Sequence, residues 1–106
     1  MKPLLEQHCT PQRGAPLQAQ VVQSLLAQVP GWCLRGNTIE RRFDFVDFNA
    51  TMAFVNTVAA IAQAQDHHPD LSVSYSQCTV RYSTHSVHGL SINDFICAAA
   101  INALAN

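Results

Sequence analysis

The sequence is short of charged residues. Its 106 residues include 6 Lys and Arg and 7 Asp and Glu, which give a formal net charge of −1 and a charged share of 12%, about half of the roughly 25% typical of soluble domains. Lys2 is the only lysine, so the chain lacks the basic surface with which proteins neutralise phosphates. We therefore expect no direct binding to nucleic acid. So little charge also favours an assembly in which another subunit covers part of the surface.

Long apolar runs and leader signals are missing as well. No stretch of about 18 consecutive apolar residues occurs, so we expect no segment that spans a membrane. The first seven residues contain no long apolar region of the kind found in secretory signals, and we expect a cytoplasmic protein. Hydrophobic residues make up 48% of the chain, which is enough for a core, and the length suits one domain.

The cysteines form no C-x-x-C pair, which argues against a zinc site, and without a secretory signal a disulfide framework is not expected. We expect small core or half-buried residues at Cys33, Cys78 and Cys97. Residues 1–15 contain proline and glycine but no sustained hydrophobic period, so we expect a flexible N-terminal arm followed by a single domain over residues 16–106. Cys9, in that arm, is a candidate exposed thiol without an assigned role.

Apolar spacing predicts three helices and four strands. Four-residue spacing from Leu17 to Val29 indicates an amphipathic helix, and period-two alternation around Phe43 indicates a strand. The expected order is helix, hairpin, helix, two strands, helix, over residues 17–29, 32–35, 38–45, 47–65, 71–75, 78–84 and 92–103. Hairpin strands beside helices long enough to cover one face predict an α+β fold. Arg41 shares a strand face with apolar residues and is expected to edge a pocket or a subunit contact.

Local signals mark where two helices begin. Asp47 or Asn49 is expected to cap the long middle helix. Ser91 and Asp94 fit the S-x-x-[DE] capping box at the start of the last helix, with Leu90 spaced to pack on the fourth helical residue. Asp94 has two compatible interpretations: it is the capping carboxylate, or it orients a loop histidine.

Four of the five histidines lie within 22 residues, at expected breaks after a helix or a strand: His67, His68, His85 and His88. Loops on a rigid scaffold are the usual place for functional side chains, and imidazole suits acid–base catalysis near neutral pH. A metal site at His85-x-x-His88 is a weaker alternative, because no acidic ligand is spaced as in H-E-x-x-H. A third alternative is structural, with His67 capping the C-terminal end of the helix before it.

The histidines belong to a longer ordered motif. His67-His68-Pro69 is followed by Tyr75, by Ser83-Thr84-His85, and by Gly89-Leu90-Ser91 through Asp94. In this order the residues resemble the pterin-4a-carbinolamine dehydratases, and the resemblance covers roughly residues 17–104. It implies an antiparallel four-stranded sheet with three helices packed on one face, a homodimer or homotetramer, and no metal or other cofactor.

The resemblance also implies an activity. Such proteins dehydrate 4a-hydroxytetrahydropterin, which an aromatic amino-acid hydroxylase leaves behind, to a quinonoid dihydropterin that a reductase recycles. Carried over by position, the catalytic residues are His67, His68 and His85. The pterin contacts fall on His67, His68, Pro69, Thr84, His85, Ser86 and Val87, with Asp94 in support. We hypothesise that His67 and His85 share the acid and base roles, that His68 holds the pterin, and that Asp94 fixes an imidazole tautomer.

Two positions depart from the family pattern. Gln63 stands where many members have an acidic residue, and Asn93 stands where a basic residue often precedes the motif aspartate. A neutral glutamine keeps a hydrogen bond but contributes no charge to a neighbouring histidine. The alternative function is a dehydratase-like partner in binding, dimerisation or assembly with weak or no activity, as some members of the family serve. The histidines His67, His68 and His85 favour the enzyme, because a scaffold needs none of them.

Overall fold

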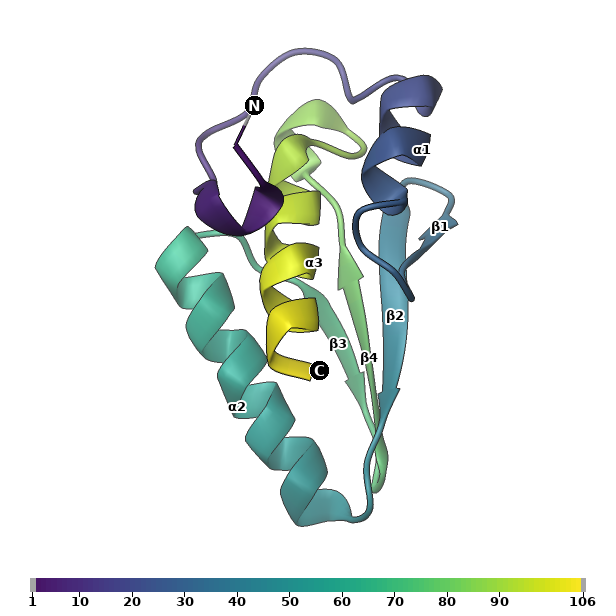
Figure 1. Cartoon of the computed structure of the whole chain (residues 1–106), viewed down its shortest axis with the longest axis vertical. Coiled ribbons are helices and arrows are strands. Elements are labelled where there is room, and N and C mark those ends of the chain that lie inside the picture. Colours follow the sequence, from purple (N-terminus) through teal and green to yellow (C-terminus); the bar gives the residue numbers. More distant parts are fainter. Residues whose placement is uncertain (1, 106) are drawn as a thin grey trace.

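The computed structural model of the chain describes residues 2–105, and its elements follow the order that the sequence predicts (Figure 1). Three α-helices and a four-stranded sheet alternate as α-β-β-α-β-β-α, with a short 3-10 helix before α1 and another before α3. The elements are η1 (Leu4–Glu6), α1 (Ala19–Leu26), β1 (Cys33–Arg35), β2 (Thr38–Asp44), α2 (Phe48–Gln65), β3 (Asp70–Val73), β4 (Gln77–Tyr82), η2 (His85–Val87) and α3 (Ile92–Ala105). The predicted α+β fold is confirmed.

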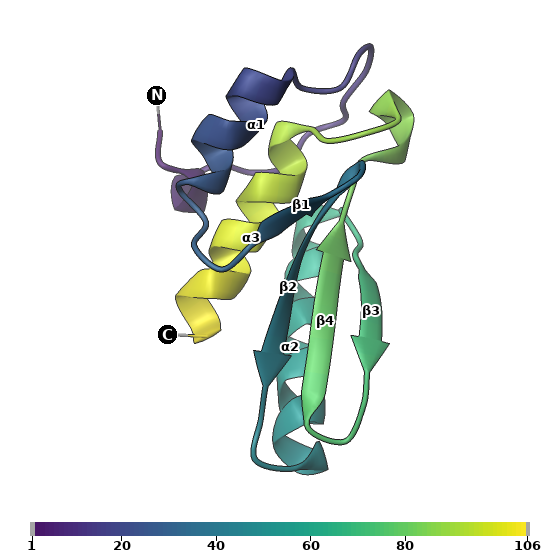
Figure 2. The ribbon, with the colours of Figure 1, turned by 90° about the vertical axis from the view of Figure 1, so that its right-hand side faces the viewer.

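The sheet has the strand order β1-β2-β4-β3, and every pair of neighbours is antiparallel. The helices lie on one face of it (Figures 1 and 2). Alternate residues of β4 point into the core, where Cys78, Val80 and Tyr82 are fully buried opposite Phe43, Arg41 and Ile39 of β2. The period-two pattern in the sequence thus reports the face that the helices cover. Among residues 2–105, no helix combines the length and apolar character that a membrane crossing needs.

Several element ends differ from the sequence prediction. The first helix ends at Leu26, because residues 27–30 continue as turns, although Val29 is fully buried. The third strand ends at Val73, and Tyr75 lies exposed in the connection to β4. Two backbone hydrogen bonds close that connection, from Ser74 N to Gln77 O and from Phe45 N to Ser76 O.

Cys33 is exposed, so the expectation of a core or half-buried residue is wrong at this position. The cause is the register of an edge strand. Cys33 pairs directly with Glu40, so the two side chains share the sheet face that the helices leave open. The following residue, Leu34, pairs with the buried Ile39 and therefore faces the helices. Cys78 and Cys97 are buried, as expected.

The N-terminal arm makes contacts that the expectation of a flexible segment did not include. Its η1 turn lies against α3, and the Leu4 side chain is only 5% exposed within the core cluster. The chain then crosses beside α3 before it reaches α1 (Figure 1). Cys9 is half-buried, with its Sγ 3.7 Å from Cys97 Sγ of α3.

Arg41 is explained by a polar cluster at the far end of α3. Its Nη1 donates to Asn102 Oδ1 at 2.6 Å, and its guanidinium lies 4.5 Å from the centre of the Phe43 ring. The buried Trp32 donates its indole N–H to the same Asn102 oxygen at 2.8 Å. Asn102 in turn donates to the carbonyl of Pro30 at 3.0 Å. The cluster therefore joins β2, α3 and the turn before β1.

Candidate active site

His67 is positioned by the way α2 ends. Asp66 adopts the left-handed conformation with φ +50°, which its short polar side chain tolerates. The N–H of Asp66 donates to Gln63 O at 3.3 Å and the N–H of His67 to Ala62 O at 3.1 Å, the two bonds of a Schellman motif. His67 thus contributes its backbone to the helix end, while its side chain is directed at α3.

Asp94 is positioned by the way α3 begins. Its Oδ2 accepts a hydrogen bond from Ser91 N at 2.9 Å, and Ser91 Oγ accepts one from Asn93 N at 3.2 Å. This is the capping box that the sequence predicts, although the serine reaches the second helical residue. At the other helix, Asp47 is the cap, because its Oδ1 accepts from Ala50 N at 2.8 Å.

The two helix ends bring His67 and Asp94 together. His67 Nε2 lies 2.6 Å from Asp94 Oδ1, with side-chain exposures of 12% and 0%. Thr84 Oγ1 donates to Asp94 Oδ2 at 2.9 Å. Together with Ser91 N, the buried carboxylate therefore accepts three hydrogen bonds, which offset the cost of removing its charge from water. Both interpretations of Asp94 hold at once: it caps α3 and it contacts a histidine.

The carboxylate fixes the state of the imidazole. A carboxylate accepts, so Nε2 carries the hydrogen in the contact with Asp94, and in the neutral ring Nδ1 is then the proton acceptor. Nδ1 has no hydrogen-bond partner within residues 2–105. Burial lowers the pKa of His67, but the hydrogen bond and negative charge of Asp94 outweigh it, so the pKa lies above its usual 6.5.

Tyr82 holds the opposite side of the histidine. The rings of His67 and Tyr82 are stacked, with centres 5.2 Å apart and planes 17° from parallel. The Tyr82 hydroxyl donates to the backbone carbonyl of His67 at 3.2 Å. Because Tyr82 is fully buried at the end of β4, it restricts both the ring and the backbone of His67.

The loop after β4 carries the second group of predicted residues. Thr84 N donates to Gly89 O at 2.7 Å, which closes a tight loop around η2. Within it Val87 is 3% exposed and anchors the loop in the core, while His85 and Ser86 are exposed. Thr84 gives its hydroxyl hydrogen to Asp94, so it accepts from Ser91 Oγ, 2.7 Å away. The loop is thereby tied to the His67–Asp94 pair.

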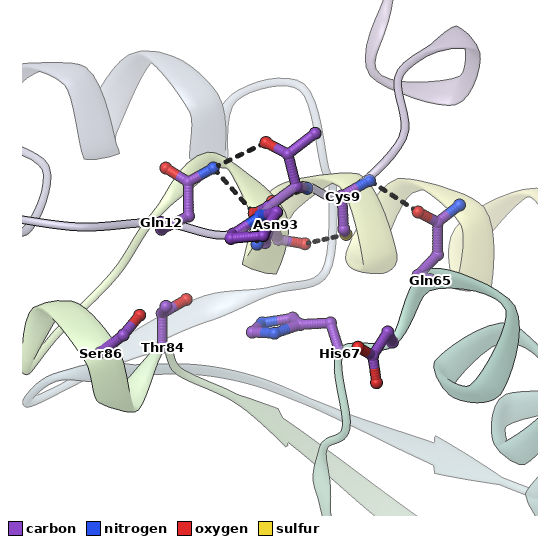
Figure 3. A pocket seen from close by; sticks show the side chains of 10 residues that line it. Cys9, Gln12, Gln65, His67, Thr84, Ser86 and Asn93 are labelled. Carbon is purple, nitrogen blue, oxygen red and sulfur yellow. Dashed lines mark hydrogen bonds between the residues drawn. The ribbon is translucent and has the colours of Figure 1, made fainter.

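A pocket of about 270 Å³ opens beside His67, slightly below the ~300–1,000 Å³ usual for small-molecule sites. Figure 3 shows His67, Thr84 and Ser86 on one side of it and residues of the arm and α3 on the other. Its lining consists of Cys9, Thr10, Pro11, Gln12, Gln65, Asp66, His67, Thr84, Ser86 and Asn93. We call it the His67 pocket.

The predicted site residues are only partly brought together. His85 lines a separate hollow with His88, and Thr84 is common to that hollow and the His67 pocket. His68 is exposed, with its Nε2 3.1 Å from Gln63 Oε1, so a neutral amide contacts this histidine. His68, Pro69 and Val87 line neither pocket. Within the part of the chain that the structure describes, no three His, Cys, Asp or Glu side chains are grouped to hold a metal ion.

Sequence reasoning missed the arm as part of the pocket, as well as Gln65 and Asn93. The arm has no hydrophobic period, and the one sign of its docking is the apolar pair Leu4 and Leu5, of which the first is buried. The sequence marks Asn93 only as a departure from the family pattern. Its neighbours come from residues about 80 positions away, which local patterns do not reveal.

Comparisons with known proteins identify the family of the chain. The family model described as pterin 4 alpha carbinolamine dehydratase matches residues 15–104. A protein of Nitrosospira multiformis is 48% identical over 103 residues, covering 95% of this chain and 91% of that protein. One from Xanthomonas campestris pv. campestris (strain B100) is 54% identical over 101 residues, covering 92% and 86%. Both carry the name "putative pterin-4-alpha-carbinolamine dehydratase".

Solved structures extend the comparison to the fold. A Brucella melitensis protein described as a transcriptional coactivator/pterin dehydratase superposes with a TM-score of 0.81 and 31% identity, over 86% of this chain and 99% of that one. A pterin dehydratase-like protein described as a RuBisCO assembly factor superposes with a TM-score of 0.59 at 20% identity, over 71% and 87% of the two chains, which shows a shared fold alone. On the family match and the near-complete coverage of its relatives, the chain belongs to the pterin-4a-carbinolamine dehydratase family.

Proposed function

We propose that the protein dehydrates 4a-hydroxytetrahydropterin to quinonoid dihydropterin and water, by acid–base catalysis at its histidines. The observation that carries the proposal is the His67–Asp94 pair, hydrogen-bonded at 2.6 Å, in which the carboxylate is fully buried and the imidazole lines a pocket. Family membership supports the same reaction.

In this reaction the C4a–O bond breaks and a C4a=N5 double bond forms. The leaving hydroxyl takes up one proton and departs as water, and N5 loses one proton, so no redox partner is needed. Asp94 raises the pKa of His67, which increases the protonated fraction near neutral pH. We therefore assign the general acid to His67 and the general base to His85, the two roles being restored in the next turnover by exchange with water.

The ligand would need to reach both histidines. Thr84 lines the His67 pocket and the hollow at His85, so a ligand lying across Thr84 has one imidazole on each side. Ser86, which also lines the His67 pocket, is then within its reach. His68 lines neither pocket, and its contact with the pterin stays a prediction from the family resemblance. The hydroxyl of Thr84 is committed to Asp94, so Thr84 supports the acid and shapes the site.

The coupled partner we propose is an aromatic amino-acid hydroxylase that supplies the carbinolamine, with the protein acting as a homodimer or homotetramer. A second candidate is a partner role in regulation or assembly. It is favoured by the description of the Brucella melitensis protein as a coactivator as well as a dehydratase. The same assay separates the two, because a partner protein needs no turnover.

The test is the decay of 4a-hydroxytetrahydropterin, generated in situ by a phenylalanine hydroxylase, with wild type, His67→Ala and His85→Ala. Each substitution is expected to lower kcat by about 10²–10⁴-fold, the usual contribution of a proton-transferring side chain. His8→Ala is the matched control, because His8 is exposed and lines neither pocket. Wild-type decay at the uncatalysed rate would refute the enzyme and leave the partner role.

A further inference from the structure

The N-terminal arm forms one side of the His67 pocket. Four consecutive residues of the arm line it: Cys9, Thr10, Pro11 and Gln12. Figure 3 shows Cys9 and Gln12 across the pocket from His67 and Thr84. The remaining lining residues come from the end of α2, the loop after β4 and the start of α3. Without the arm the pocket would be open to solvent on that side.

Asn93 holds this part of the arm by its backbone. Its Nδ2 donates to Thr10 O at 2.8 Å, and its Oδ1 accepts from Thr10 N at 3.2 Å. One side chain thus satisfies both backbone groups of a residue, as a neighbouring strand would. Asn93 is 5% exposed and lies next to Asp94 in the first turn of α3. A lysine or arginine side chain at this position would offer no acceptor for the Thr10 N–H.

Further contacts hold the arm on either side of Thr10. Gln65 Oε1, from the last turn of α2, accepts from Cys9 N at 2.7 Å. Cys9 Sγ contacts Cys97 Sγ, and upstream Leu4 is buried in the core. Ordering each residue costs about 1–2 kcal/mol of backbone entropy, so a few hydrogen bonds of about 1 kcal/mol each leave the arm only moderately stable in place.

We propose that residues 9–12 are a wall of the substrate site that contacts the bound tetrahydropterin, and that Asn93 and Gln65 are positioning residues that hold this wall. The inference rests on the proposed function, since it assigns the pterin to the His67 pocket. The wall takes no part in the proton transfer that we assign to the His67–Asp94 pair. Removing the wall therefore weakens substrate binding and leaves proton transfer in place.

The reactivity of the Cys9 thiol reports directly whether the wall is in place. The hydrogen bond with Cys97 and burial raise the pKa of the Cys9 thiol, so little reactive thiolate forms while the arm is docked. Release of the arm removes both effects. Cys33, exposed on β1 and away from the pocket, is an internal control in the same protein.

The experiment measures alkylation of Cys9 and Cys33 by iodoacetamide, followed by peptide mass mapping, with and without 7,8-dihydrobiopterin, together with steady-state kinetics. The variants are Asn93→Ala and Gln65→Ala, and Asn56→Ala, an exposed asparagine of α2, is the matched control. In wild type the dihydropterin should slow alkylation of Cys9 and leave Cys33 unchanged. Each variant should alkylate faster at Cys9 and raise KM by about tenfold, equivalent to one or two net hydrogen bonds, with kcat within about twofold.

The outcomes separate this inference from the proposed function. Equal alkylation of Cys9 with and without dihydropterin overturns the wall, whether or not the protein is a dehydratase. Faster alkylation of Cys9 in the variants with unchanged KM in an active enzyme also overturns it, while the function stands. Unchanged alkylation in both variants shows that Asn93 and Gln65 do not hold the arm. Protection of Cys9 in a protein without turnover supports the wall and refutes the dehydratase.

Discussion

Replacing Asp94 with asparagine tests the proposed site most directly, because the change keeps the shape of the side chain. Oδ2 of Asp94 accepts from Thr84 and from Ser91 N, so the amide oxygen of Asn must occupy that place. The amide NH₂ then faces His67 Nε2. Because NH₂ is a donor, Nε2 must accept a hydrogen bond from it and cannot carry a hydrogen itself. The hydrogen of the neutral ring moves to Nδ1, and the tautomer is reversed. We expect kcat to fall by about 10²–10⁴-fold.

The same change alters the pH dependence of stability. In wild type the pKa of His67 is raised above 6.5, so the pair contributes stability that is fully present below pH 6.5 and is lost as pH rises through the raised value. In Asp94→Asn the hydrogen bond and charge of Asp94 are lost, and only the smaller contributions of Cys97 and Asp66 oppose burial, so the pKa of His67 is lower than in wild type and the variant gains less stability from protonation as pH falls. The difference between the two proteins is therefore largest near pH 5–6 and shrinks in alkaline solution.

The loss at pH 6 should be about 1–2 kcal/mol, since a hydrogen bond to a charged group is worth about 1.5–3 kcal/mol and a neutral one about 0.5–1.5 kcal/mol. Urea unfolding from pH 5 to 9 measures it, and ¹⁵N shifts of the His67 ring report the tautomer. Asp70→Asn, an exposed carboxylate on β3, is the control and should change stability by less than about 0.5 kcal/mol. Wild-type kcat in Asp94→Asn with a reversed tautomer would refute the assignment of His67 as the acid.

Two further predictions concern the fold around the site. Asn102→Ala removes the acceptor of the buried Trp32 N–H and should lower the free energy of unfolding in urea by about 2–4 kcal/mol, whereas Asn56→Ala, at an exposed position of α2, should be nearly neutral. Gly31→Ala should lower the Tm more than Gly14→Ala. Both glycines have positive φ, but a Cβ at Gly31 would lie 2.7 Å from a guanidinium nitrogen and one at Gly14 meets nothing within 4 Å. Equal losses at the two glycines would show that backbone strain, without the clash, accounts for the effect.

The fold could be predicted from the sequence because the patterns that indicate its helices and strands are local. The capping box at Ser91, the cap at Asp47 and the alternation through β4 each depend on residues within a few positions. Such signals predict that Asp94 belongs to a capping box or orients a histidine, and the structure contains both contacts. The ends of the helices and strands were harder to predict, because Val29 and Tyr75 fit the apolar pattern but lie in the connections that follow α1 and β3.

The rest of the site depends on contacts between distant segments. That Asn93 binds Thr10, that Gln65 binds Cys9, and that Cys33 faces away from the helices all follow from packing and register. No period or motif in residues 1–15 predicts where the arm lies. The family resemblance marks position 93 as a departure, and the structure supplies a partner for Asn93 in Thr10, which is distant in the sequence.

The His67–Asp94 pair lies between two helix ends, and this position helps to separate a role in stability from a role in function. His67 follows the C-terminal end of α2 and Asp94 lies in the first turn of α3, so the helix dipoles favour a positive imidazole and a negative carboxylate by roughly 0.3–1 kcal/mol each. That preference acts in the same direction as the raised pKa of His67. Stability alone does not require the pair, because an apolar pair of similar volume at a buried site is often neutral or stabilising by about 1–4 kcal/mol. A histidine that lines a pocket, is held by a fully buried carboxylate and has a ring nitrogen without a hydrogen-bond partner in residues 2–105 is the arrangement that the proposed proton transfer requires.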